Sequence, residues 1–182
     1  MSNGSAQEAG ERISGKIRSS EGNRRIFYGA FLAALAIFLA IAESVIPKPL
    51  PWMRIGLANA ITLYAFTVLK PREVMLLVLS RIIASSLMLG TFLSFTFLLS
   101  LTGGIVSFFV MYLFYVLRGR WLGIVGISIL GAVSSNAAQL AVVNGLFVNS
   151  RLSYALFPFL FLFALAGGTI SGLAACFLID NI

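Results

Sequence analysis

The sequence predicts an all-α integral membrane protein, folded as a bundle of six transmembrane helices. Apolar residues make up 59% of the 182 residues and charged residues only 10%. Six apolar stretches follow one another after Arg25. A soluble domain carries about 25% charged residues. Six helices of about 20 residues, the length that crosses a bilayer, use most of the chain and leave room only for short loops.

Segments with turn chemistry separate the expected spans. The spans cover residues 26–46, 55–69, 73–91, 97–117, 122–145 and 155–179. The prolines of Pro47-Lys48-Pro49-Leu50-Pro51 cannot continue a helix, and Lys70-Pro71-Arg72 predicts a tight break. The third break is less defined, because either Gly90-Thr91 or Thr102-Gly103-Gly104 can form it.

The basic residues predict the orientation, since cytoplasmic loops carry an excess of Lys and Arg. With the N-terminus inside, nine basic residues lie on the cytoplasmic side and three on the outer side. Six spans return the C-terminus to the cytoplasm (N-in/C-in), so we expect a multi-pass protein of the plasma membrane, surrounded by lipid. This topology accounts for the net charge of +7 without nucleic-acid binding. Residues 1–24 read as a disordered cytoplasmic tail and residues 25–182 as the transmembrane domain.

The composition argues against several chemistries. The chain has no histidine, one cysteine (Cys176) and one aspartate (Asp180). Histidine is the commonest metal ligand and general base. The sequence also lacks the Gly-rich loop with Lys that binds nucleotide phosphates. We therefore expect no catalysis, no cofactor and no metal site, and an energy source in a partner or a gradient.

A few polar residues interrupt the spans, and we expect most of them in the outer half of the bilayer. They are Glu43, Arg54, Asn59, Arg81, Asn136 and Gln139. One interpretation is a pocket open to the outside, where Arg81 and Arg54 hold an anionic or carbonyl-rich small molecule. The alternative is structural: Arg81 pairs with Glu43, and the two amides join helices. The inner halves of the spans read as almost purely apolar.

Small residues recur at the spacing of helix contacts, as in Ala30-x-x-x-Ala34. Internal packing is one explanation. The other is that Ala30 and Ala34 form a face on which a partner membrane subunit docks.

Three groups of motifs resemble one known family. They are Glu43-x-x-Ile46-Pro47 with Arg54-Ile55-Gly56-Leu57-Ala58-Asn59, Ser80-Arg81-Ile82 with Ser100-Leu101-Thr102-Gly103-Gly104, and Gly126-x-Ser128-x-x-Gly131 with Asn136-x-x-Gln139. In this order, over about residues 27–175, they resemble the Gx transporter family, also known as heptaprenyl diphosphate synthase component I. That family has His-Asn before the Gln, whereas this chain has Ser135-Asn136, so its substrate preference or pH response can differ.

The family is similar in size and layout to the substrate-binding S components of energy-coupling-factor transporters. That resemblance implies an outward pocket under the first loop, an alanine-rich first helix that docks a transmembrane coupling subunit, and separate ATPases. Two other functions stay open. One is an accessory subunit of a prenyl diphosphate synthase, for which a single aspartate cannot form the Asp-rich clusters that hold Mg²⁺. The other is a structural membrane subunit.

Overall fold

The computed structural model describes residues 24, 26–44, 56–117, 123–146 and 150–180, with the side chains of 150–157 left out. Over these residues the chain forms six helices and no strand, which confirms the all-α class. The helices are an N-terminal helix at Ile26–Ser44, α2 at Leu57–Val68, α3 at Pro71–Met88, α4 at Phe95–Val116, α5 at Ile124–Leu146 and α6 at Ser150–Asp180. The expected tail 1–24, apart from Arg24, lies outside the described residues.

Four helices are long and apolar enough to cross a membrane. They are the N-terminal helix, α4, α5 and the Pro158–Asp180 part of α6. The other two differ from the expected spans. α2 has 12 residues, so it is about 18 Å long, well short of a hydrocarbon core of about 30 Å. α3 has 18 residues but carries three charges.

The breaks between the helices follow local chemistry. Pro71 opens α3, and the Glu73 carboxylate accepts a hydrogen bond of 2.8 Å from the backbone N–H of Lys70, as the expected break predicts. The third break lies before α4, where Gly90 has a φ of 67°. The alternative at Thr102-Gly103-Gly104 is wrong, because these residues lie inside α4.

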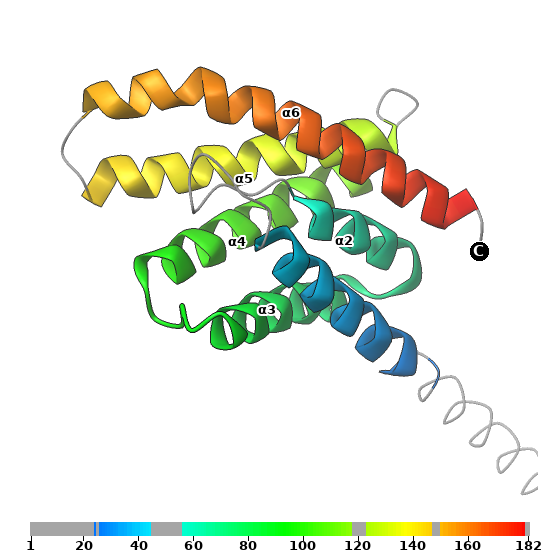
Figure 1. Ribbon diagram of the computed structural model, residues 1–182. Helices are drawn as coiled ribbons and strands as arrows, with labels where there is room; N and C mark the ends of the chain where they lie inside the picture. Colours follow the sequence, from blue (N-terminus) through cyan, green and yellow to red (C-terminus); the bar gives the residue numbers. More distant parts are fainter. Residues whose placement is uncertain (1–23, 25, 45–55, 118–122, 147–149, 181–182) are drawn as a thin grey trace, which may run out of the picture.

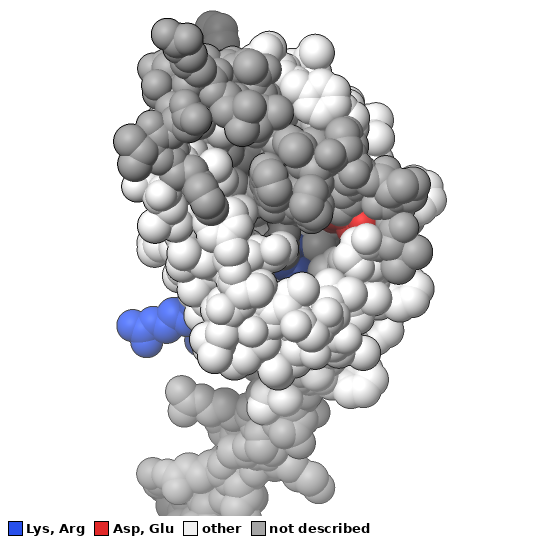
Figure 2. Space-filling model, turned by 60° about the vertical axis from the view of Figure 1, so that its left-hand side comes forward, with Lys and Arg blue, Asp and Glu red and all other residues white. Residues whose placement is uncertain are grey.

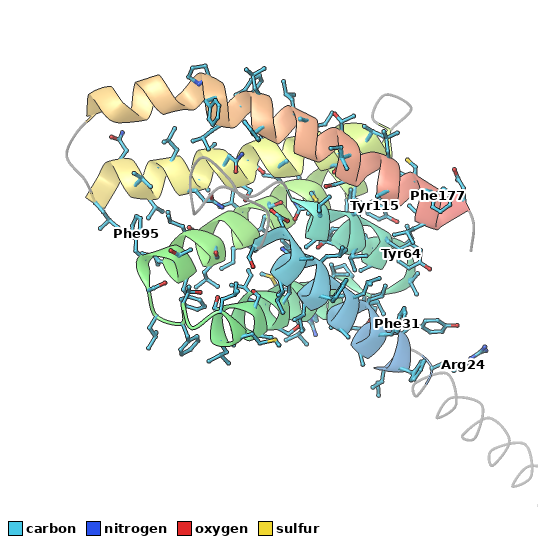
Figure 3. All side chains as sticks on the ribbon, viewed as in Figure 1. Arg24, Phe31, Tyr64, Phe95, Tyr115 and Phe177 are labelled. Atoms are coloured by element: carbon cyan, nitrogen blue, oxygen red, sulfur yellow. The ribbon has the colours of Figure 1, made fainter. Side chains whose placement is uncertain are left out.

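Helices α3, α4, α5 and α6 lie side by side in chain order (Figure 1), while α2 packs against α6 and α3. Figure 3 labels Phe95 at one end of the molecule, and Arg24 and Phe177 toward the opposite end. We call these the Phe95 end and the terminal end. In the predicted orientation, the Phe95 end faces outside.

Glycines bring α5 and α6 into backbone contact. A Cβ atom added at Gly168 would lie 2.7 Å from the Cα of Ile129, and one added at Gly172 would lie 2.7 Å from the Cα of Val125. Such close approach maximises dispersion contacts between helices in a membrane, where no hydrophobic force drives them together. The glycines of α6 therefore serve internal packing.

An aromatic cluster fills the core where α2 meets α4. The ring of Phe66 lies 5.6 Å from that of Phe108 and 5.5 Å from that of Tyr115, between centroids. Phe108 and Phe66 are buried. Aromatic pairs at these distances add to the free energy of area burial. This part of the bundle is a packed aromatic core rather than a candidate site.

Candidate functional site

Buried charge is rare in the described residues. Arg81 on α3 is 3% exposed and Glu43 on the N-terminal helix 5%, whereas the other described charged side chains are exposed or half-buried. In the view of Figure 2, basic and acidic atoms are visible near the middle of this face, among uncharged side chains. A charge inside a bilayer costs about 2.5–3.5 kcal/mol on insertion scales, so a buried charge indicates a function by default.

Arg81 lies deep in the bundle. At a rise of about 1.5 Å per residue, it is about 15 Å along α3 from Pro71 and about 10 Å from Met88. Met88 is at the end of α3 that leads, through a short turn, to Phe95. Arg81 therefore lies past the middle of α3, toward the Phe95 end.

Glu43 caps the beginning of α2. Its carboxylate oxygens accept hydrogen bonds from the backbone N–H groups of Gly56, at 3.1 Å, and Leu57, at 3.2 Å. These N–H groups have no partner within the helix, and the helix dipole favours a negative charge at this position. This role of Glu43 was not predicted from the sequence, although Gly56 directly before an apolar helix was the available signal.

Gly56 joins three helices. Its φ of 89° is in the left-handed region, and its carbonyl accepts a hydrogen bond of 2.8 Å from the hydroxyl of Ser171 on α6. The same carbonyl accepts the backbone N–H of Asn59 at 2.8 Å. Since Ser171 is only about 14 Å along α6 from Asp180, Gly56 lies in the interior of the bundle. Asn59 therefore lies in the interior and not near the outer surface as expected, because α2 is too short to reach from there.

Asn136 and Gln139 face different helices. The side-chain N–H of Asn136 donates to the backbone carbonyl of Leu160 on α6 at 3.2 Å. Both residues line a small apolar pocket together with Phe161. Gln139 faces Gly103 on α4 instead. Three positions along a helix rotate a side chain by about 300°, so the two amides point about 60° apart. For Asn136, the structure supports the helix-joining interpretation.

Gln139 packs against the backbone of α4 at Gly103. It is 2% exposed, and a Cβ atom added at Gly103 would lie 2.6 Å from its Nε2 atom and 2.8 Å from the Oγ atom of Ser135. Gln139 lies about 10 Å from the end of α5, and Gly103 about 12 Å from the beginning of α4. Arg81 lies at a similar distance, about 10 Å, from Met88 at the end of α3. The three residues are thus at a similar level, nearer the Phe95 end.

Two buried hydroxyls were missed. Ser107 on α4 and Ser128 on α5 are 2% and 0% exposed, and both lie on the far side of Gln139 from the Phe95 end. The expectation of an almost purely apolar inner half is therefore wrong along the α4–α5 interface. The signal was the spacing of small and polar residues by three and four positions: Ser100, Gly103 and Ser107, then Ser128, Gly131, Ser135 and Gln139.

The remaining predicted residues divide in two. Arg54 lies outside the described residues. Ala30 and Ala34 are exposed on the N-terminal helix, so they are not buried by internal packing. Within the described part of the chain, no group of three His, Cys, Asp or Glu side chains is close enough to hold a metal ion.

Together these features define a small helical membrane protein with a buried polar region toward one end. Over residues 32–178 the sequence matches the model of the family described as heptaprenyl diphosphate synthase component I. Because the match covers most of the 182 residues, the chain belongs to this family, which its motifs also resemble. No curated protein and no solved structure matches the sequence.

Proposed function

We propose that this chain is the substrate-binding subunit of an uptake system, similar to an energy-coupling-factor S component. It binds a small molecule that enters from the outer side, at the Phe95 end. The observation that carries this proposal is the burial of Arg81, at 3% exposure, at the same level as Gln139 and Gly103. Because burying a guanidinium in a bilayer is costly, a buried arginine indicates a functional site.

The charge of Arg81 indicates the chemistry of the substrate. A guanidinium presents donors in a planar fork that matches carboxylate, phosphate or paired carbonyl oxygens. An anionic or carbonyl-rich small molecule therefore suits the site.

The energy for uptake comes from partner proteins in this proposal. A transmembrane coupling subunit docks on the exposed face of the N-terminal helix that carries Ala30 and Ala34, and ATPases act through it. Phe31 belongs to the same exposed face, at 59% exposure. The chain itself is non-catalytic, in an N-in/C-in topology in the plasma membrane.

A second candidate function follows from the family description. A component I of a heptaprenyl diphosphate synthase system is, by that description, one part of a larger assembly. This chain would then be a non-catalytic membrane subunit, because its single aspartate cannot supply the carboxylates that hold Mg²⁺ on a diphosphate. The two functions differ in whether the chain itself retains a polar small molecule.

The test is the set of small molecules that co-purify with the protein, measured by mass spectrometry. Arg81→Ala and Arg81→Lys should each lower the amount of a retained anionic or carbonyl-rich compound by about tenfold or more, because lysine keeps the charge but loses the fork. Arg72→Ala, an exposed arginine on the same helix, is the matched control. Membrane insertion and elution as a single species show that each variant is folded.

Two results would count against the proposal. An unchanged set of retained compounds in folded Arg81→Ala removes Arg81 from the site. A wild-type protein that retains no polar compound and co-purifies with a prenyl diphosphate synthase subunit favours the second function.

A further inference from the structure

The Gln139 amide is buried without a hydrogen-bond partner. Neither its Nε2 nor its Oε1 atom has one among the described residues, and both atoms are shielded from solvent. An amide in this state loses its hydration and gains no bond in return, which is costly for donor and acceptor alike. Buried amides in native proteins are almost always satisfied, so this exception calls for a missing partner.

The surrounding backbone holds the amide in place. Gly103 on α4 lets the Gln139 Nε2 atom and the Ser135 Oγ atom approach where a Cβ atom would otherwise lie, at 2.6 and 2.8 Å. Glycine stabilises a helix less than alanine does. The close approach of these two side chains to the α4 backbone explains why position 103 is a glycine. On this side of the amide, the α4 backbone leaves no room for a ligand. A partner must reach the amide from the interior of the bundle.

The interior at this level is the proposed binding region. Gln139 lies at the level of Arg81, each about 10 Å from the last residue of its helix nearest the Phe95 end. The neighbouring glycines of α4 point about 100° apart, with Gly103 toward Gln139 and Gly104 toward Ile82 on α3. A ligand held by the guanidinium in the angle between α3 and α5 would have the Gln139 amide as a second polar anchor. Along one edge, the amide presents an N–H donor and its C=O acceptor side by side, in one plane.

We propose that Gln139 selects substrates that carry an adjacent N–H donor and C=O acceptor, as in a lactam, imide, primary amide or ureido group. This inference rests on the proposed function, and it adds a substrate class to it. The ligand supplies an acceptor to Nε2 and a donor to Oε1, so that both atoms are satisfied only in the complex. A site built to hydrogen-bond a polar group discriminates strongly against analogues that lack it, since its own buried groups are then left unpaired.

The decisive variant is Gln139→Met, which keeps length and apolar volume and removes both polar atoms. Its matched control is Ser107→Ala, because Ser107 lies on the same interface with the same 2% exposure, and its hydroxyl also has no hydrogen-bond partner among the described residues. Two quantities are measured for wild type and both variants. One is the amount of each compound that co-purifies, by mass spectrometry, and the other is the melting temperature after these compounds are stripped.

The expected results have opposite signs. In wild type, a co-purifying compound carries the adjacent N–H and C=O, and Gln139→Met lowers its amount by about tenfold or more, whereas Ser107→Ala does not. In the stripped protein, Gln139→Met raises the melting temperature by about 2–4 °C, because an unpaired amide is replaced by an apolar group.

Each contrary result is informative. A lower melting temperature for stripped Gln139→Met shows that the amide is already satisfied, for instance by buried water, and overturns the inference. So does a retained compound that lacks the N–H and C=O pair, or one whose amount is unchanged in Gln139→Met, although the proposed function then stands. Wild-type protein that retains no polar compound overturns both.

Discussion

At the scale of single residues, two carboxylates do the same job in different surroundings. Glu43 accepts the first N–H groups of α2 from another helix while buried, and Glu73 accepts the backbone N–H of Lys70 at the start of its own helix, in a more exposed position. When a capping side chain that contacts water is removed, water accepts the hydrogen bonds of the N–H groups instead. Water cannot do so where the cap is buried, so the N–H groups of Gly56 and Leu57 depend on Glu43.

Glu43→Ala should therefore lower the free energy of unfolding by about 1–3 kcal/mol, the cost of leaving these part-buried donors unpaired. Glu43→Gln should cost less, since the amide oxygen still accepts one bond. Glu73→Ala is the control and should cost about 1 kcal/mol or less. Thermal unfolding of purified protein in detergent measures all three. Equal effects of the two alanine variants would contradict the buried-cap argument.

For single residues, the sequence does not determine which neighbouring helix a polar side chain contacts. The sequence identified Asn136 and Gln139 as polar positions of one helix, and both are buried. They were assigned to one site because the predicted topology places both in the outer half of the fifth span. The two side chains point about 60° apart, so Asn136 contacts the backbone of Leu160 and Gln139 contacts Gly103. These contacts can be assigned only when the helices that pack against α5 are known.

At the scale of helices, the breaks were more predictable than the lengths of the spans. Proline and glycine act locally, so Pro71 and Gly90 end one helix or begin the next as expected. The length of α2 was not predictable in this way. Its 12 residues read like part of a full span, because apolar composition does not distinguish a short buried helix from a membrane-crossing one.

The N-terminal helix carries the docking prediction. Ala30→Trp and Ala34→Trp should abolish co-purification with a transmembrane partner, because a bulky side chain prevents the close helix approach that small residues allow. Ala166→Trp and Ala174→Trp on α6 are matched controls, since these alanines are also exposed. The amount of partner recovered with tagged protein is the measurement. Partner recovery that falls equally in all four variants would show a general packing defect instead of a docking face.

At the scale of the whole molecule, the fold class and the family were predictable, because both depend on features spread over the chain. Apolar content and the ordered motifs from Glu43 to Gln139 point the same way as the family match over residues 32–178. The depth of the polar groups depends instead on how the helices are staggered. The beginning of α2, beside Ser171, shows this, since it lies in the interior of the bundle.

The last prediction concerns sidedness, on which the uptake proposal depends. Gly123 directly precedes α5 and Gly145 lies in its last turn, and a Cβ atom added at either meets nothing within 4 Å. In a Cys176→Ser background, Gly145→Cys should react with a membrane-impermeant maleimide in intact cells. Gly123→Cys should react only after the membrane is permeabilised, because the Phe95 end is predicted to face outside. The reverse pattern would turn the polar region toward the cytoplasm, and a protein in that orientation could not capture its substrate from outside.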